Sequence, residues 1–91
     1  MNTRNNENQE EYSMTREEAR DIVYEGIQAL LDCKDTPLTE DLDLVDELGF
    51  SSLTYFFLLV RIEEKSGKRI PERKARRMET VKDIIDILAA L

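Results

Sequence analysis

The chain has 91 residues, of which 41% are hydrophobic and 36% charged, with one cysteine and no histidine. This length and composition predict a single helical globular domain, and the lack of histidine removes the commonest metal ligand and general base. The formal net charge of −7 argues against nucleic acid as a partner. We therefore expect neither a metal site nor a nucleic-acid interface.

The single cysteine, Cys33, excludes an internal disulfide and is interpreted as a small apolar residue near the end of the first helix. No apolar run reaches the roughly 18 residues of a membrane span, and no signal-peptide pattern opens the sequence. These features predict a cytoplasmic protein that does not bind a membrane.

Residues 1–12 are polar and show no apolar period, which predicts a flexible tail before a helical domain at 13–91. Thr15 and Glu18 are spaced as a capping box, so we expect the first helix to begin there. Its apolar residues form one stripe at helical spacing: Ala19, Ile22, Val23, Gly26, Ile27 and Leu30. A glycine inside a helix costs about 1 kcal/mol against alanine, which is tolerable if a neighbouring helix packs close to Gly26.

Residues 32–50 show no regular apolar period, and Pro37 ends any continuation of the first helix, which predicts a long connector. Connectors longer than about 12–15 residues are uncommon unless they are functional or tied down. Five apolar residues are available as ties: Leu38, Leu42, Leu44, Val45 and Leu48. The acids between them fit no calcium loop and are interpreted as a solvated face. A short helical turn near 39–42 is compatible with the sequence.

The connector ends in the turn Leu-Gly-Phe-Ser-Ser-Leu at 48–53, which opens the most apolar helix of the chain. Glycine permits the positive backbone angles of a tight turn, and either Ser51 or Ser52 can cap the helix that follows. A hydroxyl at that point lies at the positive end of the helix dipole, where a phosphoester is electrostatically favoured. This turn is the candidate functional site.

The second helix, from about Ser52 to Lys65, carries two neighbouring apolar stripes, although one is enough to fill a core. One stripe consists of Tyr55, Leu58, Leu59 and Ile62. The other consists of Leu53, Phe56, Phe57 and Val60. Periodicity alone does not decide which stripe faces inward.

Gly67 suits the left-handed position that ends the second helix, and Pro71 predicts the start of a short third helix through Arg76. A basic run covers this helix: Arg73, Lys74, Arg76 and Arg77. It is interpreted either as solvated surface or as a cationic patch for a phosphate, coenzyme A or an acidic partner. Residues 1–50 hold 14 acids and 4 bases, whereas residues 51–91 hold 6 acids and 9 bases.

Thr80 and Asp83 are spaced to cap a last helix. Its core stripe is Val81, Ile84, Ile85, Leu88 and Leu91. The predicted fold class is all-α: a small antiparallel four-helix bundle of three main helices and a short third helix, with a long connector between the first two helices.

The block from Asp46 to Leu53 resembles the phosphopantetheine attachment site of acyl carrier proteins, in which a leucine, a glycine and a variable residue precede an acidic residue, a serine and a leucine. The order and spacing of the helices resemble the same family from about Thr15 to Leu91. The resemblance assigns Ser52 as the serine that takes a 4′-phosphopantetheine arm, and it places Gly49, Ser51 and Leu53 around that serine. Ser51 stands where most fatty-acid carriers have aspartate.

The resemblance also implies what the protein works with. A phosphopantetheinyl transferase would load the arm from coenzyme A, and the arm would carry acyl or aminoacyl thioesters between loading and synthase enzymes of fatty acid, polyketide or related biosynthesis. The chain itself would be a monomer without catalytic activity.

The family turns one face of the second helix toward such partner enzymes, so the stripe with Leu58 is expected in the core. Residues for partner docking are then Leu53, Phe56, Phe57, Val60, Arg61, Arg73, Lys74, Arg76 and Arg77. Phe57 and Arg61 replace the acidic character that this face has in the family, so we expect docking to depend more on apolar contact.

Two other functions compete with a carrier. Serine hydrolysis is disfavoured because Leu53 stands where a nucleophile elbow needs its second glycine, and no histidine is present to take the serine proton. A helical adaptor that keeps the carrier fold, is never modified and acts only by binding other proteins stays open. The serine at the right place favours the carrier.

Overall fold

The computed structural model describes residues 14–32 and 37–91; the predicted tail at 1–12 and Cys33 lie outside the described residues. In the described ranges the chain forms four helices and no strand: α1 (Arg16–Leu31), α2 (Ser52–Ser66), α3 (Glu72–Ala75) and α4 (Val81–Ala90). The all-α prediction is confirmed. None of these helices is long and apolar enough to cross a bilayer.

Local sequence signals set the ends of the helices. Thr15 and Glu18 form the predicted capping box, in which the Thr15 hydroxyl accepts the Glu18 N–H and the Glu18 carboxylate accepts the Thr15 N–H. Thr80 and Asp83 form the same arrangement at α4. Gly67 ends α2 in the left-handed conformation, with φ at 73°. These ends agree with the sequence prediction.

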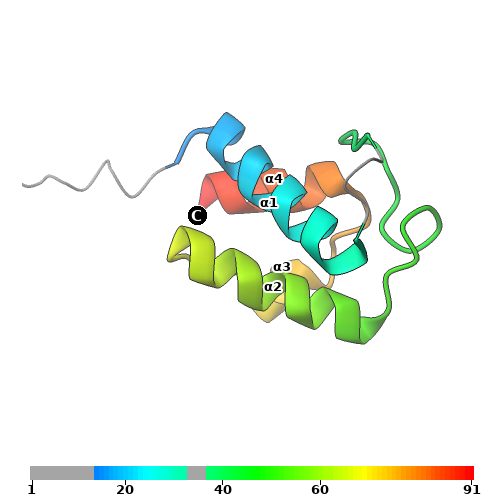
Figure 1. Cartoon of the computed structure of the whole chain (residues 1–91). Coiled ribbons are helices and arrows are strands. Elements are labelled where there is room, and N and C mark those ends of the chain that lie inside the picture. The colour runs from blue at the N-terminus through cyan, green and yellow to red at the C-terminus, as the bar shows by residue number, and fades with distance from the viewer. Residues whose placement is uncertain (1–13, 33–36) are drawn as a thin grey trace, which may run out of the picture.

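Helix α1 packs against both α2 and α4. In Figure 1, α1 runs from left to right, whereas α2 and α4 run back from right to left. The short α3 lies alongside α2, where residues of both line a common groove. This arrangement leaves the start of α2 and all of α3 at the surface of the molecule.

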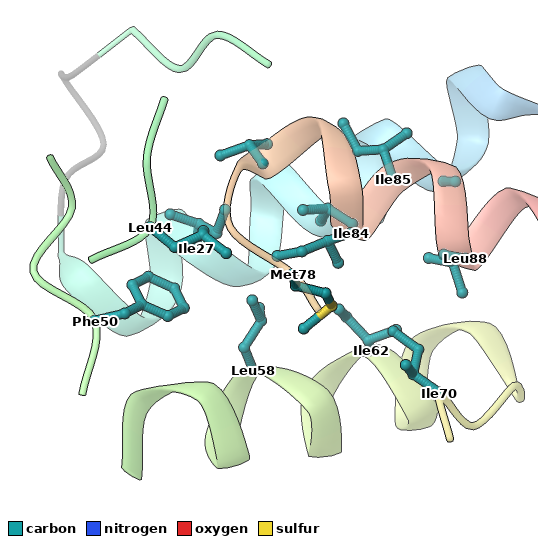
Figure 2. Close-up of a cluster of buried hydrophobic side chains, with 13 residues drawn as sticks. Ile27, Leu44, Phe50, Leu58, Ile62, Ile70, Met78, Ile84, Ile85 and Leu88 are labelled. Carbon is teal, nitrogen blue, oxygen red and sulfur yellow. The ribbon is translucent and has the colours of Figure 1, made fainter. Parts of the chain in front are cut away.

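The hydrophobic core lies between α1, α2 and α4 (Figure 2). Figure 2 shows Leu58 and Ile62 rising from α2 toward Met78 and the isoleucines of α4. Tyr55 and Leu59 are partly buried beside them, so the stripe with Leu58 is the one that faces the core. Burying one large aliphatic side chain contributes about 1.5–3 kcal/mol, so Leu58 and Ile62 both stabilise this orientation of α2.

Gly26 is buried where α1 and α2 approach each other. A Cβ atom at this position would lie 2.8 Å from Cδ1 of Leu58, closer than two carbon atoms normally approach. The glycine therefore permits the close helix packing that its place in the apolar stripe predicted.

The connector is held by fewer side chains than predicted. Leu44 is fully buried, and three other leucines are partly buried against the core: Leu38, Leu42 and Leu48. Val45 is 53% exposed, so its predicted role as a tie was wrong. The Asp43 carboxylate accepts the N–H groups of Val45 and Asp46 and bends the chain there, which turns Val45 outward while Leu44 points inward. The turn near 39–42 is a single hydrogen-bonded turn and not a helix.

Backbone hydrogen bonds join the connector to the segment that leads into α4. The Leu44 N–H donates to the Glu79 carbonyl at 2.9 Å. In return, the N–H groups at the start of α4 donate to connector carbonyls, Val81 to Leu42 at 3.1 Å and Lys82 to Glu40 at 2.8 Å. The connector is thereby fixed to the core by main-chain contacts as well as by Leu44.

A charged cluster joins α1, the connector and α4. Arg16 donates from Nη2 to Glu40 at 2.6 Å and from Nε to Asp86 at 2.9 Å, and Lys82 also donates to Asp86, at 2.7 Å. The hydrogen bond from Arg16 lowers the pKa of Glu40, and those from Lys82 and Arg16 lower the pKa of Asp86. The cluster holds three separate parts of the chain together at one end of α1.

Candidate functional site

The turn before α2 is anchored by Phe50. Gly49 has φ at 73°, as the sequence predicted for a tight turn, and the Phe50 N–H donates to the Leu44 carbonyl at 2.8 Å. The Phe50 ring is buried and meets the Tyr55 ring edge-on, with the ring centroids 5.2 Å apart. This contact joins the residue before the helix cap to the helix's first full turn, as in a hydrophobic staple, and fixes the direction in which the chain enters α2.

The two adjacent serines have different environments. Ser51 is the helix cap: its hydroxyl accepts the Thr54 N–H at 3.2 Å and shares a second hydrogen bond with the Thr54 hydroxyl at 3.0 Å. Ser52 is the first residue of α2 and is exposed. Within residues 14–32 and 37–91, no hydrogen bond engages the Ser52 hydroxyl. It lies at the positive end of a helix whose first turn contains no acid.

A groove of about 470 Å³ opens beside Ser52. Its walls come from α2 and from α3 with the residues that follow it: Ser52, Tyr55, Phe56, Leu59, Glu72, Ala75, Arg76 and Met78. The Tyr55 hydroxyl donates to the Met78 carbonyl at 3.2 Å and so holds the two walls together. Burial, followed by the nearby carboxylates of Asp43, Glu79 and Asp83, raises the pKa of Tyr55, so the phenol stays neutral and keeps its proton for this bond.

The second stripe of α2 faces solvent. Its exposed fractions are 60% for Leu53, 59% for Phe56, 47% for Phe57 and 38% for Val60. The Phe56 and Phe57 rings lie with their centroids 5.9 Å apart. The structure therefore places this apolar surface directly after Ser52, on the first three turns of the same helix.

Arg61, which the resemblance placed among the docking residues, forms an intramolecular ion pair with Glu25. Its guanidinium donates from Nε to the Glu25 carboxylate at 3.1 Å and makes a second contact with the same carboxylate through Nη2. This bidentate pair joins α2 to α1, and the hydrogen bonds lower the pKa of Glu25. The resemblance gave no sign of this pairing because it depends on how the two helices are rotated.

The predicted basic run is divided between two sides of α3. Arg76 lines the groove beside Ser52 and forms an ion pair with Glu72 at 3.0 Å. Lys74 and Arg77 line a second groove, of about 300 Å³, on the side of α4. Arg73 is exposed on α3 itself.

Sequence reasoning missed several residues that shape the site. Phe50 appeared only as the variable residue of the motif, although an apolar residue just before a cap, with another at the fourth helical position, is a known pattern at helix starts. The groove residues Ala75 and Met78 gave no periodic signal, because α3 is a single short turn. Among the described residues, no group of histidine, cysteine, aspartate or glutamate side chains is arranged to hold a metal ion.

Comparison with known proteins agrees with this geometry. A family model described as the phosphopantetheine attachment site matches residues 21–88. The acyl carrier protein of Campylobacter hominis is 31% identical over 75 residues, which cover 82% of this chain and 90% of that protein. The acyl carrier protein of Borreliella burgdorferi is 33% identical over 75 residues, covering 82% of this chain and 94% of that protein.

A solved structure adds the fold to this relationship. The structure of a candidate acyl carrier protein from Mycobacterium tuberculosis matches with a TM-score of 0.74 at 32% identity, over 79% of this chain and 96% of that chain. Two features define a class of small carriers: a helical domain with a serine at the start of its second helix, and a match to the phosphopantetheine attachment site. The chain belongs to the acyl carrier protein family.

Proposed function

We propose that this protein carries acyl or aminoacyl groups as thioesters on a 4′-phosphopantetheine arm attached to Ser52. The observation that carries the proposal is the state of the Ser52 hydroxyl, which is exposed and which no hydrogen bond occupies within the described part of the chain. The Ser51 hydroxyl is a poorer acceptor for the arm because it already caps α2. Gly49 contributes the turn and Leu53 the apolar surface beside the serine.

Ser52 takes part in one chemical step, as the nucleophile that accepts the arm. Its Oγ gains a bond to phosphorus while the pyrophosphate P–O bond of coenzyme A breaks. Adenosine 3′,5′-bisphosphate leaves, and a base on the transferase takes the serine proton. The N–H groups in the first turn of α2 favour the phosphoester, because they are at the positive end of the helix and no first-turn acid opposes them. The bound arm supplies the thiol that holds the acyl group.

A carrier of this kind has to bind the enzymes that load it and use its cargo. We infer that a phosphopantetheinyl transferase and the loading and synthase enzymes of fatty acid, polyketide or related biosynthesis bind a monomer of this chain. The exposed apolar stripe of α2 supports docking there, because it begins at the residue after Ser52. Attachment to one carrier raises the effective concentration of the cargo at each successive enzyme without requiring tight binding.

We also infer the finer features of the fold that the resemblance implies. The directions of α1, α2 and α4 in Figure 1 support an antiparallel bundle. The absence of a helix between residues 37 and 51 supports a long connector before α2. The division into a tail at 1–12 and a helical domain at 13–91 stays a proposal.

Intact-mass measurement tests the proposed function. The chain is incubated with coenzyme A and a broad-specificity phosphopantetheinyl transferase. Wild type and Ser51→Ala should each gain the mass of one arm, whereas Ser52→Ala should gain none. Gain by Ser52→Ala but not by Ser51→Ala would move the attachment to Ser51. No gain by any of the three would favour the unmodified adaptor.

A further inference from the structure

The acids of the connector are largely engaged within the molecule, although the chain has a net charge of −7. Glu40 is bound by Arg16, and the Asp41 carboxylate accepts the Thr39 hydroxyl. The Asp43 carboxylate accepts two backbone N–H groups, and Glu47 accepts the Asp43 N–H. Asp43 and Glu47 thereby hold the turn before Ser52, and Glu40 holds the connector to α1. These contacts reduce what the carboxylates can offer to another molecule.

The bases around α3 are in the opposite situation. Across 14–32 and 37–91, Arg73, Lys74 and Arg77 form no ion pair, and Arg76 pairs only with Glu72. That pair has side chains 76% and 80% exposed, so it contributes little and exchanges readily for another carboxylate. We call these four residues the α3 basic cluster. It is one part of the described surface where cationic side chains are free to meet a partner.

One member of the α3 basic cluster, Arg76, lies beside the proposed attachment site, whereas Lys74 and Arg77 line the groove on the side of α4. Arg76 lines the same groove as Ser52 and Phe56, so α3 forms the wall opposite the exposed stripe of α2. An enzyme that reaches Ser52 must therefore come close to an apolar surface on one side and to cations on the other. A second pair of bases, Lys65 and Arg69, is remote, because Lys65 is about 20 Å along α2 from Ser52 at 1.5 Å per residue.

We propose that the enzymes acting on the arm dock here through a surface with an apolar centre for Phe56 and Phe57 and an acidic rim for the α3 basic cluster. The inference rests on the proposed function, since it identifies the partner by its need to reach Ser52. The net negative charge of the chain does not prevent this contact, because charges act over only about 8 Å at physiological ionic strength. Rim charges of this kind make the contact selective for an acidic partner and also speed its association.

Nuclear magnetic resonance titration of the full, unmodified chain tests the docking chemistry without the arm. The probes are two synthetic amphipathic helical peptides with the same leucine and phenylalanine stripe, one flanked by glutamate and the other by lysine. At about 0.1 M salt the glutamate peptide should bind more tightly and shift the amide signals of α2 near Phe56 and those of α3. In about 1 M salt, where screening shortens to about 3 Å, this preference should disappear.

A pair of matched variants identifies the cations. Arg73→Glu with Arg76→Glu and Lys65→Glu with Arg69→Glu change the net charge equally. The first variant should weaken binding of the glutamate peptide about tenfold and reverse the preference between peptides, whereas the second should change binding less than about twofold. The titration uses the unmodified chain, so its result does not depend on attachment of the arm. A failure of docking is thus distinguished from a failure of arm attachment, which the mass measurement reports.

Four outcomes would overturn the proposal. The first is binding of the lysine peptide that equals or exceeds that of the glutamate peptide. The second is an equal loss of peptide affinity in the two charge-reversal variants. The other two would show that something other than an acidic enzyme surface binds here. A concentration-dependent dimer in sedimentation that the α3 reversal abolishes would identify a second copy of the chain as the occupant. Binding of phosphatidylserine vesicles in preference to the glutamate peptide would identify a lipid surface instead.

Discussion

Tyr55 connects the proposed attachment site to the core through one side chain. Its ring packs on Phe50 before the helix cap, and its hydroxyl reaches the Met78 carbonyl after α3. The phenol therefore fixes both the start of α2 and the far wall of the groove beside Ser52. A change of one oxygen atom at this position tests how far the site depends on that link.

Tyr55→Phe should lower the free energy of unfolding by about 1 kcal/mol, because it removes one hydrogen bond and leaves the Met78 carbonyl without its donor. The effect should depend on pH. The fold raises the pKa of Tyr55, so its contribution is complete below the ordinary tyrosine pKa of about 10 and is lost as the pH rises through the folded value. Urea unfolding at neutral pH and above pH ~10 measures both effects.

The control for this measurement is Tyr24→Phe, since the pKa of Tyr24 is also raised by burial but the residue is remote from the groove. Between neutral pH and pH above ~10, the free energy of unfolding should fall more for wild type than for Tyr55→Phe. An equal alkaline loss in wild type and Tyr55→Phe would contradict the role assigned to the phenol.

Alanine substitutions of Ser51 and Ser52 should differ in their effect on the free energy of unfolding. Ser51→Ala removes the cap of α2 and should cost about 1 kcal/mol, whereas Ser52→Ala, whose hydroxyl makes no internal bond among the described residues, should change stability by less than about 0.5 kcal/mol. Thermal or urea unfolding of the apo forms measures this. A larger loss for Ser52→Ala than for Ser51→Ala would show that the capping assignment is wrong.

At the scale of the helices, α2 presents one stripe inward and one outward. Leu58→Ala should cost about 2–5 kcal/mol, because the fully buried side chain leaves a cavity. Phe57→Ala should cost about 0.5 kcal/mol or less, while slowing transfer of the arm by removing an exposed apolar contact. Denaturant melts give the first quantity and a transferase assay the second. Equal losses of stability would place both stripes in the core.

Gly26 tests the distance between α1 and α2. Gly26→Ala gains about 1 kcal/mol of helix propensity but adds a methyl group against Leu58, and overpacking costs about 1–3 kcal/mol, so we expect a net loss of up to about 2 kcal/mol. Leu58 is fully buried and has little room to move away. In a Leu58→Ala background the same substitution should become stabilising. A double-mutant cycle by urea unfolding measures this coupling, and additive effects would show that the two residues do not touch.

The sequence was sufficient to predict most of the helical framework. Capping residues and glycine gave the ends of the helices, because these depend on hydrogen bonds within a few residues: Thr15, Thr80 and Gly67. Periodicity gave the buried faces of α1 and α4 but not that of α2, where two stripes were available. The family resemblance chose the correct stripe. The exposure of Val45 was missed because a side-chain contact of Asp43 bends the backbone there.

At the scale of the whole molecule, stability in acid should depend on the cluster around Arg16. The lowered pKa values of Glu40 and Asp86 mean that their contribution is present above the ordinary carboxyl pKa of about 4 and is lost as the pH falls through the folded values. Arg16→Met should therefore be less stable than wild type at pH 7. The difference should fade toward pH ~2 and shrink in high salt.

Arg20→Met is the matched control for the acid measurement. The exposed fractions of the two arginine side chains are similar, at 43% for Arg16 and 38% for Arg20. The ion pairs of Arg20, however, are with Glu17 and Asp21 of the same helix. Circular dichroism during acid titration should show a smaller effect for Arg20→Met. A difference between wild type and Arg16→Met that is independent of pH would assign the effect to packing of the arginine stem.

Contacts between distant parts of the chain were the least predictable. Arg16 meets residues 24 and 70 positions away, and Arg61 meets Glu25 at a separation of 36. Such pairs depend on the rotation and offset of packed helices, which no local pattern reports. The candidate serine was predicted because its motif is continuous in sequence, whereas the groove beside it was not, since its second wall comes from α3.

The backbone bonds between the connector and the start of α4 also determine how the protein moves. The amide protons of Leu44, Val81 and Lys82 form the hydrogen bonds across that junction. They should therefore exchange with solvent only when the domain opens as a whole. The segment before Ser52 then belongs to the same cooperative unit as the core, despite its irregular shape. We therefore expect Ser52 to stand on a rigid frame, so that in the proposed carrier the reach from one enzyme to the next comes from the arm and from diffusion of the entire domain.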